Sequence, residues 1–128
     1  MRHGYKHMKI LFVDDDPSLV RFAEQVLPAF GIDVCGAFSG DEGLAAFVEQ
    51  EFDVAVVDIF MPGRDGMEVI AELRERHPQT KVLAISGMNA QEWDFLKAAK
   101  ALGADMVLRK PFSASKLAMV LRRLNERR

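Results

Sequence analysis

The chain has 128 residues, of which 49% are apolar and 28% are charged, a balance typical of one globular domain of ordinary size. The formal net charge of −2 provides no general attraction to nucleic acid, and no apolar stretch approaches the roughly 18 residues of a transmembrane helix. The single cysteine, Cys35, excludes an internal disulfide, and the polar residues 1–7 lack the apolar segment of a signal peptide. We therefore expect a cytoplasmic protein with no direct role at a membrane or on nucleic acid.

Short apolar runs alternate with amphipathic segments five times along the chain. Such runs predict buried strands, which we place at Lys9–Val13, Ile32–Ala37, Asp53–Val57, Lys81–Ile85 and Asp105–Leu108. Residues 1–7 are interpreted as an N-terminal extension, and residues 8–128 as a single domain.

Capping and breaking residues mark the helices. Asp16 followed by Pro17 predicts the start of the first helix, and Pro28 predicts a kink or the end of it. We place the fourth helix at about Ala90–Leu102, and Ser113 is expected to cap the fifth.

The second and third helices follow the same signals. Ser39 and Glu42 have the spacing of a capping box, and the helix that follows is expected to bury Leu44, Phe47 and Val48. The third helix follows a loop at residues 60–66 that is rich in proline and glycine, and its apolar positions are Val69, Ile70 and Leu73.

Alternating strands and helices predict a parallel α/β sheet with right-handed crossovers and helices on both faces. Coverage of both faces explains why the first and third strands are almost entirely apolar. In such a sheet the active crevice lies at the carboxyl ends of the strands.

Charged side chains follow three of these strands. Asp14 and Asp15 follow the first, Asp58 the third and Lys110 the fifth, while the hydroxyl of Ser86 follows the fourth. Two carboxylates about 5 Å apart repel each other by ~3 kcal/mol at an effective dielectric constant near 20. A bound cation relieves this repulsion, and open carboxylate sites that also meet phosphate oxygens suit Mg²⁺.

These residues together predict a phosphoryl site. Asp58 is the candidate nucleophile, because a carboxylate can accept a phosphoryl group as an acyl phosphate, and Lys110 supplies positive charge for the phosphoryl oxygens. Taken singly, an aspartate at a strand end is more often a helix cap, a lysine is often a solvated surface residue and a serine a turn residue. Their occurrence at four strand ends together favours the phosphoryl site.

The chain resembles the receiver domains of two-component response regulators, the CheY-like family. The resemblance covers about residues 8–126, and the matching segments are Lys9–Pro17, Val57–Gly66, Ile85–Gly87, Gly103–Asp105 and Lys110–Phe112. It implies a flavodoxin-like, three-layer α/β/α fold with a five-stranded parallel sheet of order 2-1-3-4-5 and five helices. Residues 8–128 are then the receiver domain.

The resemblance also implies roles for individual residues. Asp58 is then the phosphoacceptor, and Asp14, Asp15, Asp58 and the backbone carbonyl of Phe60 hold Mg²⁺. Lys110 pairs with the phosphoryl group, and the peptide bond between Lys110 and Pro111 is expected to be cis.

Switching is implied in the same way. Ser86 moves toward the phosphoryl group with the backbone amide of Gly87, and the fourth helix, fifth strand and fifth helix repack as the output face. Phosphorylation gives the acceptor up to about two negative charges, which is the physical cause of this movement.

Two features depart from the family. Position 107 usually carries Tyr or Phe and here carries Val107, so the usual aromatic switch cannot operate; the stretch from Ser86 to Gly103 also looks about two residues longer than is common. Trp93 or Phe95 is a candidate replacement for the missing ring, against ordinary packing as the simpler interpretation.

Two bulky apolar residues lie near the acceptor and the switch hydroxyl in the sequence. Phe60 and Met88 occupy positions that influence phosphoryl lifetime in the family, and we expect them to restrict the attacking water and prolong the acyl phosphate.

The leading hypothesis is a signalling switch that accepts a phosphoryl group from a histidine kinase or histidine phosphotransfer protein and turns over no separate substrate. Its target is a downstream protein or an output domain that 128 residues cannot include, with a homodimer also possible. One alternative is a pseudo-receiver that acts only in dimerisation or docking. The other is a haloacid-dehalogenase-like phosphatase that uses Asp14 as nucleophile and Asp16 as acid, against which Pro17 and the short chain argue.

Overall fold

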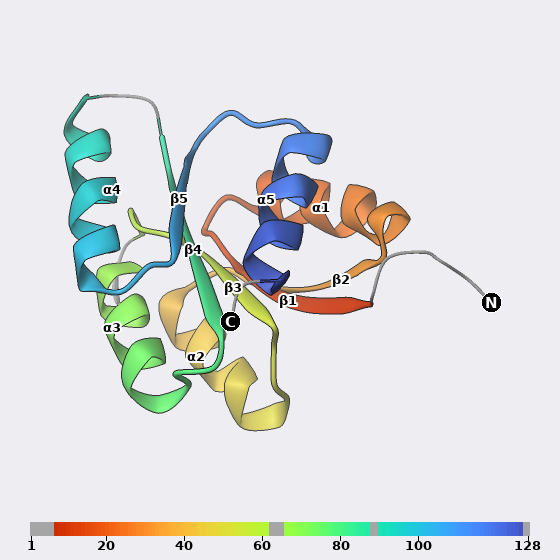
Figure 1. Cartoon of the computed structure of the whole chain (residues 1–128), viewed down its shortest axis with the longest axis horizontal. Helices are drawn as coiled ribbons and strands as arrows, with labels where there is room; N and C mark the ends of the chain where they lie inside the picture. The colour runs from red at the N-terminus through yellow and green to blue at the C-terminus, as the bar shows by residue number, and fades with distance from the viewer. Residues whose placement is uncertain (1–6, 62–65, 88–89, 127–128) are drawn as a thin grey trace.

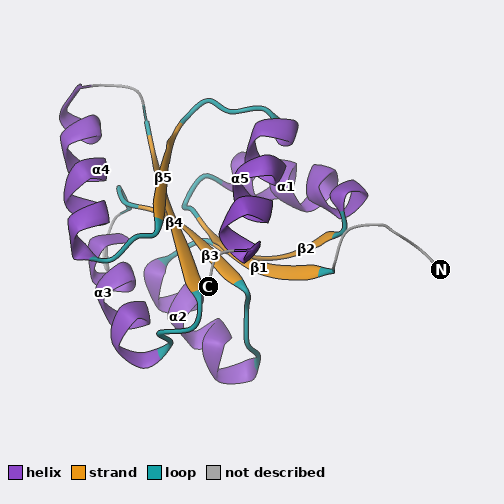
Figure 2. Cartoon of the chain, in the orientation of Figure 1, coloured by secondary structure: helices purple, strands orange, loops and turns teal. Residues whose placement is uncertain are grey.

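A computed structural model describes residues 7–61, 66–87 and 90–126, with the side chains of residues 90–93 excluded. Figures 1 and 2 show the strands and helices alternating along the chain. Their bounds are β1 Met8–Val13, α1 Pro17–Val26, a 3₁₀ helix η1 Leu27–Phe30, β2 Ile32–Ala37, α2 Gly40–Glu49, β3 Val54–Asp58, α3 Gly66–Arg76, β4 Lys81–Ser86, α4 Ala90–Leu102, β5 Met106–Arg109 and α5 Ala114–Glu126.

The five strands form one parallel sheet in the order β2-β1-β3-β4-β5. Val13 lies level with Val57, Asp58 with Ile85, and Ser86 with Arg109. The carboxyl ends of β1, β3, β4 and β5 therefore meet at one edge. This arrangement confirms the predicted flavodoxin-like fold.

Two apolar clusters lie on the two faces of the sheet. Figure 1 shows that α1 and α5 cover one face and that α2, α3 and α4 cover the other. Alternate residues of each strand point to opposite faces. In β1, Leu11 packs toward Phe47 and Leu73 on one face, whereas Phe12 packs toward Val20 and Leu121 on the other. Burial on both faces is why the central strands carry apolar residues at consecutive positions.

Side-chain caps begin three helices where the sequence predicts them. The Asp16 carboxylate accepts a hydrogen bond from the Ser18 N–H at 3.0 Å, and the Ser39 hydroxyl accepts one from the Glu42 N–H at 3.1 Å. The Ser113 hydroxyl likewise accepts from the Lys116 N–H at 3.1 Å. These bonds satisfy N–H groups that the first helical turn leaves without partners.

Two helix predictions have different outcomes. Helix α1 ends at Val26, and the 3₁₀ turn that contains Pro28 ends at Phe30, before Gly31 with a φ of 78°, so the predicted break is correct. The expected burial of Val48 is wrong, because its side chain is 83% exposed. The buried side of α2 faces the core through Gly43 and Phe47, and each residue turns about 100° around a helix, so the next position after Phe47 points away.

The third, fourth and fifth strands end one residue later than predicted, and the third and fifth also begin one residue later. The Ile59 N–H donates to the Ile85 carbonyl at 3.1 Å, which continues the ladder past Asp58. Asp58 and Ser86 are thus the last residues of β3 and β4 and share the rigidity of the sheet. Among the described residues, no helix has the length and apolar character needed to cross a membrane.

Candidate phosphoryl and metal site

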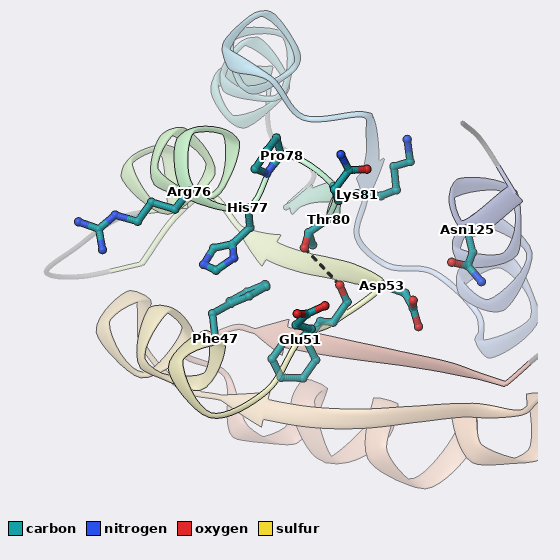
Figure 3. Close-up of a pocket in the computed structure, with 11 residues that line it drawn as sticks. Phe47, Glu51, Asp53, Arg76, His77, Pro78, Thr80, Lys81 and Asn125 are labelled. Atoms are coloured by element: carbon teal, nitrogen blue, oxygen red, sulfur yellow. Dashed lines mark hydrogen bonds between the residues drawn. The ribbon is translucent and has the colours of Figure 1, made fainter.

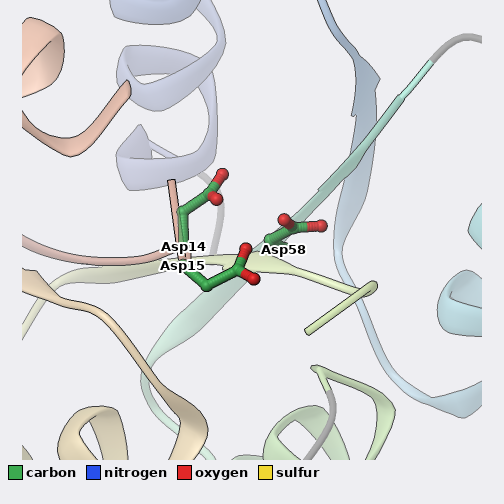
Figure 4. A group of neighbouring side chains, drawn as sticks. All are labelled: Asp14, Asp15 and Asp58. Carbon is green, nitrogen blue, oxygen red and sulfur yellow. The ribbon is translucent and has the colours of Figure 1, made fainter. Parts of the chain in front are cut away.

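Three carboxylates meet at the carboxyl edge of the sheet, as Figure 4 shows. Asp14 and Asp15 follow β1, and Asp58 ends β3; one oxygen of each lies within 4.8 Å of the others. Asp14 is fully buried and Asp58 is 4% exposed, whereas Asp15 is exposed to solvent. The cluster therefore combines two buried acceptors with one that faces the solution.

The Lys110 ammonium lies between the two buried carboxylates. Its Nζ is 2.9 Å from Asp14 Oδ2 and 3.3 Å from Asp58 Oδ2. The Lys110 N–H donates to the Ser86 carbonyl at 2.7 Å, which fixes the backbone from which the side chain extends. The bond between Lys110 and Pro111 is cis, the isomer that the family resemblance implies.

The charges of these groups influence one another. Burial raises the pKa of the Asp58 carboxyl to about 6, and the nearby Asp14 adds to this, against a hydrogen bond from Phe60 and the charge of Lys110. Burial alone would lower the pKa of Lys110, but its contacts with Asp14 and Asp58 raise it above its usual value. Lys110 therefore stays charged at neutral pH, while Asp58 is a more basic carboxylate than usual.

Asp14 Oδ2 is a suitable ligand for a cation. Asp14 Oδ1 accepts a hydrogen bond from the Asp16 N–H at 2.9 Å. Asp14 Oδ2 is buried and contacts the Lys110 ammonium at 2.9 Å, which leaves it capacity for a second positively charged partner. A buried carboxylate oxygen with spare capacity beside two further carboxylates is a suitable donor set for a hard divalent cation.

The remaining predicted site residues surround this cluster. The Phe60 N–H donates to Asp58 Oδ1 at 3.0 Å, and the Phe60 ring is 39% exposed. Ser86 is fully buried at the end of β4, and Gly87 follows it in a half-buried position. Met88, predicted to influence phosphoryl lifetime, lies outside the described residues.

The model of the response regulator receiver domain family matches residues 10–122. The chain belongs to this family. Receiver domains generally bind Mg²⁺ through acidic residues, and the acidic cluster of this chain stands at the corresponding edge of the fold.

Solved structures agree with the family match. The receiver domain of Francisella response regulator 1452 is 31% identical, with a TM-score of 0.83, and the match covers 94% of this chain and 98% of that one. Vibrio cholerae chemotaxis protein CheY4 is 30% identical, with a TM-score of 0.82 and coverage of 93% and 99%. Brucella abortus NtrX is 30% identical, with a TM-score of 0.87, but the match covers 94% of this chain and only 27% of NtrX.

This receiver domain has Val107 where an aromatic residue is usual. Val107 lies half-buried on β5, level with Ala84 of β4. An aromatic pair is present elsewhere: the rings of Phe60 and Phe95 meet edge to face, with centroids 4.9 Å apart. The sequence suggested Phe95 as a replacement ring but gave no indication that Phe60 would be its partner, because the two residues are brought together only by packing. The side chain of Trp93, the other candidate, lies outside the described part of the chain.

Sequence reasoning also missed the function of Gly66 in the receiver site. A Cβ atom at this position would lie 2.2 Å from the Asp58 carbonyl oxygen and 2.5 Å from Ile59 Cα. Only glycine lets the start of α3 approach the end of β3 this closely. Its place in the glycine-containing loop after Asp58 was the available sequence signal.

A pocket of about 550 Å³ lies at the edge of the sheet opposite the carboxylate cluster, and Figure 3 shows the residues that line it. Its walls include the rings of Phe47 and His77, which are tilted by 31° with centroids 4.4 Å apart, and both acidic and basic side chains. None of the predicted site residues lines it, so size alone does not identify the functional site of this receiver domain.

Proposed function

We propose that this receiver domain is a phosphorylation-dependent switch in which Asp58 accepts a phosphoryl group from a histidine kinase or histidine phosphotransfer protein. The observation that supports the proposal best is the position of Asp58, a buried carboxylate paired with Asp14 and contacted by the Lys110 ammonium at 3.3 Å. A second buried carboxylate would only destabilise an aspartate with a purely structural role, because two negative charges repel each other.

The transfer reaction uses these groups directly. An Asp58 oxygen attacks the phosphorus of a phosphohistidine; as the new O–P bond forms, the P–N bond breaks and its electron pair returns to the imidazole nitrogen. Lys110 carries a positive charge between the carboxylates and can pair with the phosphoryl oxygens. The Ser86 hydroxyl and the Gly87 amide are the proposed groups that respond to the new negative charge.

We propose that Mg²⁺ is bound by Asp14, Asp15, Asp58 and the Phe60 carbonyl. When bound, the ion would neutralise charge on the carboxylates and the phosphoryl oxygens. The spare capacity of Asp14 Oδ2 and the proximity of the three carboxylates support this donor set. Asp14 and Asp58 are held by the ends of two paired strands, so these donors are positioned before the ion arrives.

The phosphatase alternative requires Asp16 to act as a general acid, but in this structure Asp16 caps α1. Its carboxylate accepts hydrogen bonds from both the hydroxyl and the N–H of Ser18, at 2.7 and 3.0 Å. These bonds lower the pKa of Asp16, whereas a general acid needs a raised one. We propose that the chain catalyses only its own phosphorylation and dephosphorylation, and turnover of a phosphate monoester by the Asp58→Asn variant would contradict this.

Receiver domains act with kinases or phosphotransfer proteins and with output domains, and we propose that α4, β5 and α5 form the output face here. The cytoplasmic location, the division at residue 8 and the possible homodimer remain predictions.

The deciding experiment is phosphorylation of the full chain by acetyl phosphate, followed by intact mass spectrometry. We expect the wild type to gain one phosphoryl group only with Mg²⁺, and Asp58→Asn to gain none. Glu75→Gln changes an exposed carboxylate on α3 and should behave as the wild type. Absence of any Mg²⁺-dependent modification in the wild type would favour the pseudo-receiver alternative.

A further inference from the structure

Two partly exposed aromatic rings connect the phosphoryl site to α4. Phe60 follows the acceptor strand and is 39% exposed, and Phe95 lies on α4 and is 40% exposed. Their ring planes meet at 77°, with centroids 4.9 Å apart. Edge-to-face pairs at this separation attract each other beyond the area that they bury.

A hydrogen bond connects the Phe60 backbone to the acceptor, and burial of neighbouring residues connects Phe95 to the core. The Phe60 N–H donates to Asp58 Oδ1, so its backbone depends on the hydrogen bonding of the acceptor carboxylate. Phe95 precedes the fully buried Leu96, and Ala99 one turn later is also fully buried, so the rotational position of α4 fixes where the ring lies. A change at Asp58 therefore acts on one ring, and movement of α4 acts on the other.

Strand β5 carries no aromatic residue that could make this connection, because its position 107 is a valine. In the described part of the chain, the other two ring contacts both involve Phe47, with Phe52 and with His77, at the opposite edge of the sheet. In Figure 1 the short described segment that follows β3 reaches toward α4, in agreement with the contact between the two rings.

We propose that the Phe60–Phe95 contact stabilises the position of α4 in the unphosphorylated protein and thereby opposes the switch. This inference rests on the proposed function. A contact made in one state only shifts the equilibrium between the states by its own free energy. For an aromatic pair, this corresponds to a factor of about two to ten in the population ratio.

The test measures the apparent affinity for beryllofluoride with Mg²⁺ by backbone-amide NMR, using the full chain. We expect Phe95→Ala to bind this phosphoryl mimic about two- to tenfold more tightly than the wild type, since it removes only resting-state stabilisation. Amides of α4 should also exchange with solvent faster before beryllofluoride is added. Phe95→Tyr, which keeps the ring, should behave as the wild type.

Three further variants test the helix position, the pairing of the two rings and the folding of the variant. Leu102→Ala removes a 43% exposed apolar side chain from the same helix, two turns further along, and should leave the affinity unchanged. The double variant Phe60→Ala/Phe95→Ala should show a gain smaller than the product of the two single effects, because the two residues share one contact. If Phe95→Ala is poorly folded, Phe95→Leu removes the ring while keeping apolar bulk.

The outcomes separate this inference from the proposed function. A wild type that responds to beryllofluoride with Mg²⁺, together with a Phe95→Ala variant of equal or weaker affinity, overturns the inference alone. Independent, multiplicative effects of Phe60→Ala and Phe95→Ala would overturn it as well. A wild type with no Mg²⁺-dependent response overturns both the inference and the proposed function.

Discussion

Replacing the acceptor carboxylate with a neutral isostere should stabilise the protein without Mg²⁺. Asp58 lies 4% exposed beside the fully buried Asp14, and burial is the main reason that its pKa rises from 3.8 to about 6. A raised carboxyl pKa means that the charged form is less favourable in the folded protein than in the unfolded chain. The Asp58→Asn variant removes that charge and can keep the hydrogen bond from the Phe60 N–H.

The magnitude follows from the two pKa values. The rise from 3.8 to about 6 corresponds to at most about 3 kcal/mol of free energy of unfolding. In the Asp58→Asn variant, the amide orientation that keeps the Phe60 hydrogen bond points its NH₂ at the Lys110 ammonium, and the reverse orientation loses that hydrogen bond, so either orientation reduces the gain. We therefore expect Asp58→Asn to raise the free energy of unfolding by about 1–2 kcal/mol at neutral pH.

The sign of the pH dependence is fixed by the same shift. Between pH 3.8 and about 6 the folded protein binds more protons at Asp58 than the unfolded chain, so wild-type stability from this group falls as pH rises. The cost of the charge is fully present above pH about 6 and disappears as pH falls through 6 toward 3.8. The advantage of the variant should therefore be largest at neutral pH and vanish near pH 4.

Urea denaturation followed by far-ultraviolet circular dichroism, with EDTA present, measures this difference across the pH range. Glu75→Gln, an exposed carboxylate change, should shift stability by no more than about 0.5 kcal/mol at every pH. Added Mg²⁺ should narrow the difference, because it binds the folded wild type. A variant that is no more stable than the wild type at neutral pH, or a difference independent of pH, would refute this reasoning.

Three other changes have defined outcomes. Lys110→Ala should lower the free energy of unfolding by about 1–3 kcal/mol in urea denaturation, because Asp14 and Asp58 lose their shared counter-charge; unchanged stability would mean that the ion pairs contribute nothing. Gly66→Ala should cost about 1–3 kcal/mol in the same assay, since its Cβ would overlap the Asp58 carbonyl, and a neutral result would show that α3 shifts freely. Phe60→Ser should shorten the half-life of the phosphorylated protein, measured by intact mass after removal of acetyl phosphate, and an equal half-life would argue against shielding by the ring.

Most of the fold was predictable because its signals are local. The apolar runs of β1 and β3, the Asp16, Ser39 and Ser113 caps and the Pro28 break depend on neighbouring residues, and all are found in the structure. The exposure of Val48 could not be predicted from neighbouring residues. Its apolar character favoured burial, but the packing of α2 through Gly43 and Phe47 determined which side of that helix faces the core.

The sequence by itself determined which chemical groups stand at the carboxyl edge of the sheet. The alternation of strands and helices and the residue types suffice for this, because residues at the carboxyl ends of parallel strands lie at the same edge of the sheet. Only the tertiary structure decided how these groups meet: the Lys110 Nζ between Asp14 and Asp58, the approach of Gly66 to β3, and the contact of Phe60 with Phe95. These contacts depend on how helices and loops pack across the sheet, and packing sums many weak interactions between residues distant in sequence, which no local pattern records.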